Sequence, residues 1–152
     1  MTGQSETVFV LPGHLREPNQ LGQGSYGDVI EAVDIHTGFK VVIKKFRHPW
    51  MMPVAAKRAF RELHMLRYIR EKWTPPADPE DNLGDLAHEN IIPMLDCYIP
   101  PFQYRIAGQE HLYVIMEHGE QTLEGVMQMQ TVGESHAAWF GYSILCVLGR
   151  LW

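Results

Sequence analysis

Three glycines and one lysine are the residues whose types and spacing point first to chemistry. Gly22, Gly24 and Gly27 have G-x-G-x-x-G spacing, and Lys44 follows seventeen residues after the last of them in a strand-like segment. Glycine has no Cβ atom to hold a backbone away from a phosphate group, and it adopts the positive φ angles of a tight loop. The spacing therefore indicates a phosphate-binding loop. By itself it does not distinguish between several classes of nucleotide-binding protein.

The segments that flank the glycines separate two uses of such a loop. Residues 28–34 and 39–46 read as two strands joined by a turn, because both segments mix β-branched residues with polar ones. Residues 7–11 are expected to form a further strand before the loop, with a break at residues 12–13. In a dinucleotide-binding Rossmann unit the glycines open a helix, whereas here they lead into a strand. The sequence therefore favours a β-hairpin over a Rossmann unit.

A helix is expected from about residue 54 to residue 72, and it contains one carboxylate in an unusual place. Its inward face carries four apolar residues, Ala55, Ala59, Leu66 and Ile69. Glu62 lies in the middle of this apolar stripe, so its carboxylate is directed toward the expected core. An unpaired buried charge is costly, so Glu62 should have a cationic partner, for which Lys44 is the natural candidate. The alternative is that Glu62 lies at the edge of the stripe and reaches solvent.

Composition and charge exclude several other classes of function. A net charge of -5 argues against a nucleic-acid partner. The first residues lack the features of a signal peptide, and the longest apolar stretch, residues 137–148, is too short to cross a bilayer. We therefore expect an intracellular protein, cytoplasmic or nuclear, with no membrane partner. Cys97, Cys146 and the scattered histidines lack metal-ligand spacing, so no metal site is expected.

The order of these motifs resembles the N-terminal part of a eukaryotic protein kinase domain, most closely the mitogen-activated protein kinase branch of the serine/threonine kinases. The residues that carry the resemblance are 21–29, 41–44, 61–62, 88–93, 112–117 and 136–152. The resemblance implies an α+β fold. It consists of a protein-kinase-like small lobe, with an antiparallel β-sheet and one αC-type helix, followed by a hinge and the first helices of an incomplete large lobe.

The resemblance also divides the chain into segments. They are an N-terminal segment (1–19), the small lobe (20–116), the hinge (117–121) and the start of a truncated helical large lobe (122–152). The small lobe contains a proline- and acid-rich insert at residues 71–87, which is expected to be a surface loop, with a docking element as the alternative.

ATP is the ligand that the resemblance implies, with Mg²⁺ present only as the ATP complex. Backbone N–H groups of the glycine loop would cover the phosphates, and Val29 would close over the adenine. Lys44 would hold the α- and β-phosphates and would be fixed by Glu62, so these two are the implied catalytic residues. The implied nucleotide-binding residues are Leu21, Gly22, Gln23, Gly24, Ser25, Tyr26, Gly27, Val29, Val42, Lys44, Met116, Glu117, His118 and Gly119.

Several of these assignments depend on strand register or local fit. Met116 would guard the back of the adenine pocket, and the backbone of residues 117–119 would bind the adenine edge. Val42 stands where kinases usually have Ala, so its extra methyl groups would crowd the adenine and weaken ATP binding. Lys45 fits the strand motif in a second register. Strand alternation lets only one of the two lysines face the nucleotide, and the family pattern favours Lys44.

Other kinase motifs are absent from these 152 residues. There is no H-R-D followed by Asn, no D-F-G and no A-P-E, so the catalytic Asp and the protein ligands of Mg²⁺ are missing. This chain alone is therefore expected not to transfer a phosphoryl group from ATP to a protein Ser or Thr. The alternatives are a non-catalytic ATP-binding regulatory fragment, or an interaction module that docks on a protein partner through the apolar helix at residues 136–152.

Overall fold

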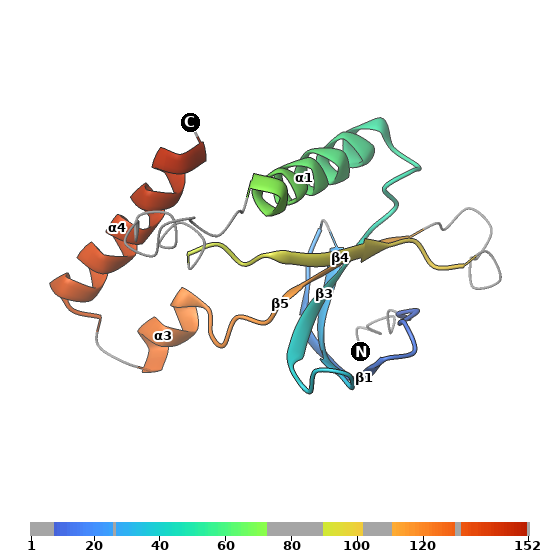
Figure 1. Ribbon diagram of the computed structural model, residues 1–152, viewed down its shortest axis with the longest axis horizontal. Coiled ribbons are helices and arrows are strands. Elements are labelled where there is room, and N and C mark those ends of the chain that lie inside the picture. Colours follow the sequence, from blue (N-terminus) through green and yellow to red (C-terminus); the bar gives the residue numbers. More distant parts are fainter. Residues whose placement is uncertain (1–7, 26, 73–89, 102–110, 130–131, 152) are drawn as a thin grey trace, which may run out of the picture. The chain divides into compact units, whose positions relative to one another are not determined.

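The computed structural model describes residues 8–25, 27–72, 90–101, 111–129 and 132–151. The strands are β1 (Leu15–Gln23), β2 (Gly27–Asp34), β3 (Lys40–Phe46), β4 (Met94–Tyr98) and β5 (Leu112–Glu117). The helices are α1 (Pro53–Lys72), α3 (Leu123–Met129) and α4 (Glu134–Leu151), as labelled in Figure 1. The chain divides into two compact units, one of Met1–Arg67 with Met94–His118 and the other of Tyr68–Pro93 with Gly119–Trp152.

The first unit is built on a five-stranded antiparallel sheet. The strand order is β1-β2-β3-β5-β4, so the strand that follows the glycines lies next to the strand that carries Lys44. The predicted α+β class is confirmed, with a sheet and one long helix after β3. The predicted strands at residues 28–34 and 39–46 correspond to β2 and β3, and residues 112–117, one of the segments that carry the resemblance, form β5.

Each face of the sheet has its own hydrophobic core, because side chains alternate between the two faces along each strand. One core contains Leu15, Ile30, Ala32, Val41, Ile43, Tyr113 and Ile115, with Phe9 and Leu11 packed against it. The other core contains Phe46, Ala59, Met94, Leu112 and Val114, with Leu63, Leu66 and Met116 packed against it. α1 therefore covers the second face, and the segment before β1 covers the first.

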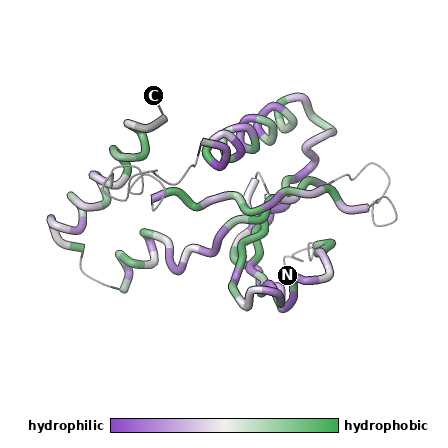
Figure 2. The backbone as a smooth tube through the Cα atoms, viewed as in Figure 1, coloured by the Kyte–Doolittle hydropathy of each residue, from purple (hydrophilic) through white to green (hydrophobic). Residues whose placement is uncertain are grey.

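α1 owes its start and its direction to local sequence. Pro53 occupies the first helical position, where its missing N–H is not needed, and the amide of Ala56 donates to the carbonyl of Met52 at 3.0 Å. The helix is amphipathic, because Ala59, Leu63 and Leu66 pack in the core on the sheet. Figure 2 shows hydrophilic residues between the hydrophobic ones along this helix. Ala59, the most buried residue of this helix, is 4% exposed in the core shared with the sheet.

The helices α3 and α4 of the second unit have favourable polar residues at their N-termini. The Thr122 hydroxyl accepts a hydrogen bond from the amide of Gly125 at 3.1 Å, which caps α3. α4 has Glu134 in its first turn, where a carboxylate is favoured by the helix dipole. α4 corresponds to the helix expected from residue 136, and its bounds are Glu134–Leu151.

The expected strand at residues 7–11 is wrong in its described part. Residues 8–11 are not a strand, and the edge strand is β1, which begins at Leu15. β1 lacks an alternating pattern because it lies at the edge of the sheet, where all but two of its residues are exposed. It is also interrupted by a register shift around Glu17, whose φ is 56°, and Pro18. Phe9 and Leu11 of this segment are apolar because they pack against the core on one face of the sheet.

Some predicted features lie outside the described residues. These are Tyr26 of the glycine loop and residues 73–87 of the predicted insert. Glu71 and Lys72, the first residues of the predicted insert, form the end of α1. Among the helices that the structure describes, none combines the length and the apolar character that a membrane span needs.

Candidate functional site

The glycine loop makes a tight connection between β1 and β2. The amide of Gly24 donates a hydrogen bond to the carbonyl of Gly27 at 2.9 Å, and β2 begins at Gly27. A side chain at Gly27 would collide with the backbone carbonyl of Lys45, whereas nothing lies within 4 Å of the position that a Cβ on Gly22 would take. The predicted order, glycines followed by a strand, is therefore present. The close approach of β2 to β3 requires a glycine at position 27.

Lys44 and Glu62 meet as the sequence predicts. The Nζ atom of Lys44 lies 2.5 Å from Oε1 of Glu62, so β3 and α1 are joined by a charge-assisted hydrogen bond. Their side chains are 21% and 35% exposed, so the pair is accessible from solvent. The Lys44 ammonium also lies 4.9 Å from the centre of the Phe46 ring. This geometry leaves a fixed positive charge on the face of the sheet that α1 covers.

Lys45 lies on the opposite face. Its side chain is buried, and Nζ donates a hydrogen bond to the carbonyl of Val8 at 2.7 Å. Burial lowers the pKa of Lys45 from its ordinary value, although the charge of Asp28 opposes this shift. In the observed register, Lys44 is therefore the lysine that faces Glu62, and Lys45 holds the N-terminal segment.

A second ion pair joins the start of β2 to the residue after β3. Asp28, only 2% exposed, accepts hydrogen bonds from the Arg47 guanidinium at 2.5 Å and 3.2 Å. The Asp28 carboxylate raises the pKa of Arg47 above its ordinary value through this hydrogen bond. The pair anchors the strand that follows the glycine loop next to the strand that carries Lys44.

A cavity of about 550 Å³ opens between the glycine loop, β3 and the first half of α1. Ser25 of the loop, Lys44 and Glu62 line it together, and Arg58 and His48 add further basic groups. All of these residues belong to the first unit. The structure thus brings the predicted phosphate-binding lysine and its glutamate into one cavity with the glycine loop.

The residues expected at the base end share a sheet face with Lys44. Val29 is the cross-strand partner of Lys44, and Val42 is the partner of Met116. All three apolar side chains are half-buried, and none of them lines the cavity described above. Their placement on one face follows the predicted alternation, and their roles toward a nucleotide remain predictions.

The remaining predicted residues lie at the ends of strands. Leu21, Gly22 and Gln23 are at the end of β1, where the Leu21 side chain is 49% exposed. Glu117 is the last residue of β5 and His118 follows it. Gly119 belongs to the second unit.

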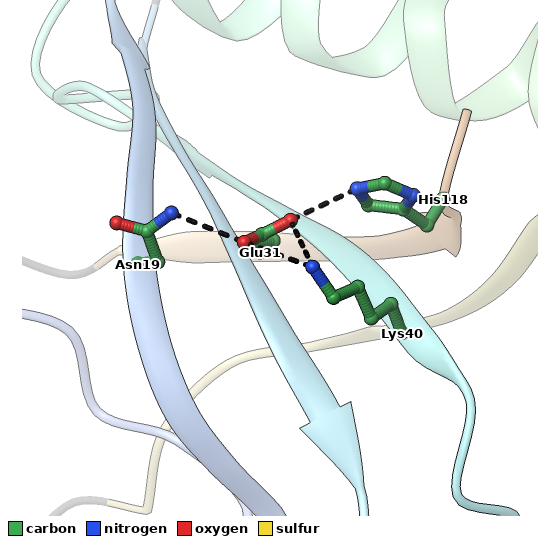
Figure 3. Close-up of polar contacts among 4 residues, drawn as sticks. All are labelled: Asn19, Glu31, Lys40 and His118. Atoms are coloured by element: carbon green, nitrogen blue, oxygen red, sulfur yellow. Dashed lines mark hydrogen bonds and ion pairs between the residues drawn. The ribbon is translucent and has the colours of Figure 1, made fainter. Parts of the chain in front are cut away.

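A polar cluster that was not predicted from the sequence is centred on Glu31 of β2 (Figure 3). Glu31 accepts hydrogen bonds from Asn19 Nδ2 at 3.0 Å and Lys40 Nζ at 3.3 Å, and its Oε2 lies 2.9 Å from His118 Nε2. The hydrogen bond from Asn19 is the largest cause that lowers the pKa of Glu31; partial burial opposes the shift, and Lys40 and His118 add to it. Alternation from Val29 could have placed Glu31 on the same face, but no sequence signal links it to His118.

Comparisons with known proteins place the chain in a family. No protein-family model matches it. It is 34% identical over 140 residues to mitogen-activated protein kinase spk1 of Schizosaccharomyces pombe, which is 92% of this chain and 32% of that protein. It is 32% identical over 126 residues to mitogen-activated protein kinase 13 of Mus musculus, covering 83% of this chain and 29% of the relative.

A third relative is also a mitogen-activated protein kinase. Mitogen-activated protein kinase 12 of Homo sapiens is 30% identical over 141 residues, which is 93% of this chain and 33% of the relative. The chain spans about a third of the length of the curated relatives it matches. The chain belongs to the mitogen-activated-protein-kinase-like family of protein kinases and matches the N-terminal portion of the kinase domain.

Proposed function

We propose that this chain binds ATP, as its Mg²⁺ complex, through the glycine loop and the Lys44–Glu62 pair. The observation that carries the proposal is that Ser25, Lys44 and Glu62 line one cavity, with Nζ of Lys44 held 2.5 Å from Glu62. A fixed ammonium beside a glycine-rich turn is a chemical fit to phosphate oxygens. The accessibility of the pair is also consistent with a ligand, because Lys44 remains 21% exposed.

Each part of the site would contribute a different interaction. Backbone N–H groups of the glycine loop would donate to phosphate oxygens, and Lys44 would neutralise part of their charge. Val29, Val42 and Met116 would form the apolar surface for the base, where Val42 reduces the room available. The backbone of residues 117–119 would bind the edge of the base.

The reaction we propose for the protein to which these residues belong is serine/threonine phosphorylation. ATP supplies the γ-phosphoryl group that is transferred to a protein hydroxyl, and catalysis rests on positioning and electrostatics. The 152 residues would contribute nucleotide binding and the Lys44–Glu62 pair to this reaction. We further propose an intracellular location, cytoplasmic or nuclear, since the relatives are mitogen-activated protein kinases.

Isothermal titration calorimetry of the 152-residue chain with Mg²⁺-ATP tests the proposal. Lys44→Ala should weaken ATP affinity about tenfold or more, because it removes a charge-assisted hydrogen bond donor. The matched control is Lys57→Ala, which removes an equal charge from an exposed position on the same α1 that carries Glu62. Equal affinities for the two variants, or no ATP binding by the unaltered chain, would contradict the proposal.

A second candidate function is a protein-interaction role for α4. The observation that favours it is the exposure of large apolar side chains along this helix, including Trp139 at 61% and Leu145 at 67%. Under this proposal the chain should bind a hydrophobic dye or associate with itself. A monomeric chain that does not bind the dye would argue against it.

A further inference from the structure

The hydrogen-bonded ladder between β3 and β5 ends at Glu117, the first residue of the predicted hinge, and a cluster of polar side chains lies beyond that end. The last cross-strand pair in the ladder is Val41 with Glu117. Beyond this pair come Lys40, which precedes Val41 in β3, and His118, which follows Glu117. Both of their side chains contact Glu31 of the neighbouring β2. Glu31 therefore joins three segments at the point where backbone pairing ends.

The partners of Glu31 come from different parts of the chain. Asn19 belongs to β1 and Lys40 to β3, and His118 is the residue that follows β5. Figure 3 shows all three side chains directed toward the Glu31 carboxylate. Four contacts of 2.9 to 3.3 Å use both carboxylate oxygens. Glu31 is also the cross-strand partner of Val42, so the cluster lies on the sheet face proposed to hold the base.

The contacts of Glu31 differ in their expected strength. The Lys40 side chain is 55% exposed, and an ion pair with such an exposed amine contributes little to stability. The side chains of Glu31 and His118 are only 15% and 19% exposed, and their atoms are 2.9 Å apart. A hydrogen bond to a carboxylate that is largely shielded from water is the stronger kind. The Glu31–His118 contact is therefore better shielded from water than the ion pair with Lys40, and it joins the residue after β5 to β2.

We propose that Glu31 is a positioning residue that holds the hinge through His118. By fixing the His118 side chain, it sets where the backbone of residues 117–118 lies relative to β2, beyond the end of the ladder. The nucleotide part of this inference rests on the proposed function. If the base binds to that backbone, Glu31 sets base affinity without contacting the phosphates.

Backbone hydrogen exchange tests the positioning role without any nucleotide. In the 152-residue chain, Glu31→Ala should speed exchange of the amides of residues 116–118 about fivefold to tenfold, since one charge-assisted hydrogen bond is lost. The amide of Ile43, in the centre of the sheet, should not change, which separates a local effect from general unfolding. Asn19→Ala is the matched control, because it removes a partner of Glu31 and leaves the His118 contact in place.

Conservative replacement of His118 gives a second test. His118→Ala should reproduce the faster exchange at residues 116–117, whereas His118→Gln, which keeps a side-chain donor, should restore most of the protection. Unchanged exchange at residues 116–118 in Glu31→Ala would overturn the inference. Equal acceleration in Asn19→Ala would overturn it as well.

Ligand binding then separates this inference from the proposed function. Glu31→Ala should lower affinity for Mg²⁺-ATP about fivefold to tenfold and leave affinity for inorganic tripolyphosphate, which has no base, unchanged. Equal loss for both ligands would contradict a role limited to the hinge. If the unaltered chain binds neither ligand, the proposed function fails, and the exchange measurement still decides whether Glu31 positions the hinge.

Discussion

At the scale of single residues, adjacent lysines have opposite environments. Lys44 reaches Glu62 on α1, while Lys45 is 6% exposed and donates to the carbonyl of Val8 on the other face of the sheet. Because side chains alternate along β3, a shift of one residue would exchange the two environments. The Asp28–Arg47 pair and the close approach at Gly27 both oppose such a shift.

Gly27→Ala and Gly22→Ala form a matched pair of substitutions in the glycine loop. Gly27→Ala should lower the free energy of unfolding by about 2 kcal/mol, because the new methyl group meets the carbonyl of Lys45 and the strands must move apart. Gly22→Ala should change it by less than about 1 kcal/mol, since nothing lies within 4 Å of the added carbon. Urea denaturation measures both. Similar values for the two variants would show that β2 does not need its close approach to β3.

At the scale of elements, side chains fasten an irregular segment to the sheet. The Tyr98 hydroxyl donates to the carbonyl of Val10 at 3.0 Å, and the amide of Val10 donates to the Tyr113 hydroxyl at 3.4 Å. The rings of Tyr98 and Tyr113 stack with centres 4.9 Å apart. These contacts hold residues 8–11 over the sheet without a strand ladder.

This arrangement predicts a loss of stability at alkaline pH. Burial raises the pKa of Tyr98, and burial also raises the pKa of Tyr113, so the folded chain keeps phenolic protons that the unfolded chain releases near pH 10. The contribution of these two groups is complete below about pH 10 and is lost as the pH rises further, because the folded state then binds more protons.

Tyr98→Phe checks this expectation. At neutral pH the variant should lose about 1 kcal/mol of unfolding free energy with the hydrogen bond to Val10. Above about pH 10 its stability should fall less steeply than that of the unaltered chain, because one raised pKa has been removed. Urea denaturation at several pH values measures both effects. Tyr68→Phe, at an exposed position of α1, is the control. If the unfolding free energy fell equally steeply with pH in both variants, the assignment to Tyr98 would be refuted.

At the scale of the whole molecule, apolar residues are used in two different ways. Both cores belong to the sheet unit, where Ile43 and Val114 are fully buried. α4 belongs to the other unit and leaves Trp139, Ile144 and Leu145 about 60% exposed or more. Stability of the described chain should therefore depend far more on the sheet than on α4.

Truncation of one apolar residue in each unit tests this division. Ile43→Ala should lower the free energy of unfolding by about 3 kcal/mol, because it leaves a cavity in the sheet core. Leu145→Ala should change it by less than about 0.5 kcal/mol, since that side chain is 67% exposed. Urea denaturation followed by circular dichroism measures the difference. A large loss in Leu145→Ala would mean that α4 is packed in solution.

The sequence by itself determined the α+β class, three of the strands, the long helix after β3 and the partnership of Lys44 with Glu62. The strands at residues 28–34 and 39–46, the helix and the ion pair follow from local composition, from periodicity and from the cost of an unpaired buried charge. The α+β class and the strand at residues 112–117 came from the resemblance to protein kinases. The family also followed from motif order, and the relatives agree with it.

Only the tertiary structure decided the position of β1 at an edge of the sheet and the contacts of Glu31. β1 is largely exposed and carries no alternating pattern, so its pairing with β2 depends on the neighbouring strand rather than on its own residues. Glu31 and His118 are 87 residues apart in the chain, and no local pattern relates them. They meet because β3 lies between β2 and β5 in the sheet, so that His118, the residue after β5, reaches Glu31 of β2. Contacts of this kind come from the order of strands in the sheet, which spacing along the sequence does not encode.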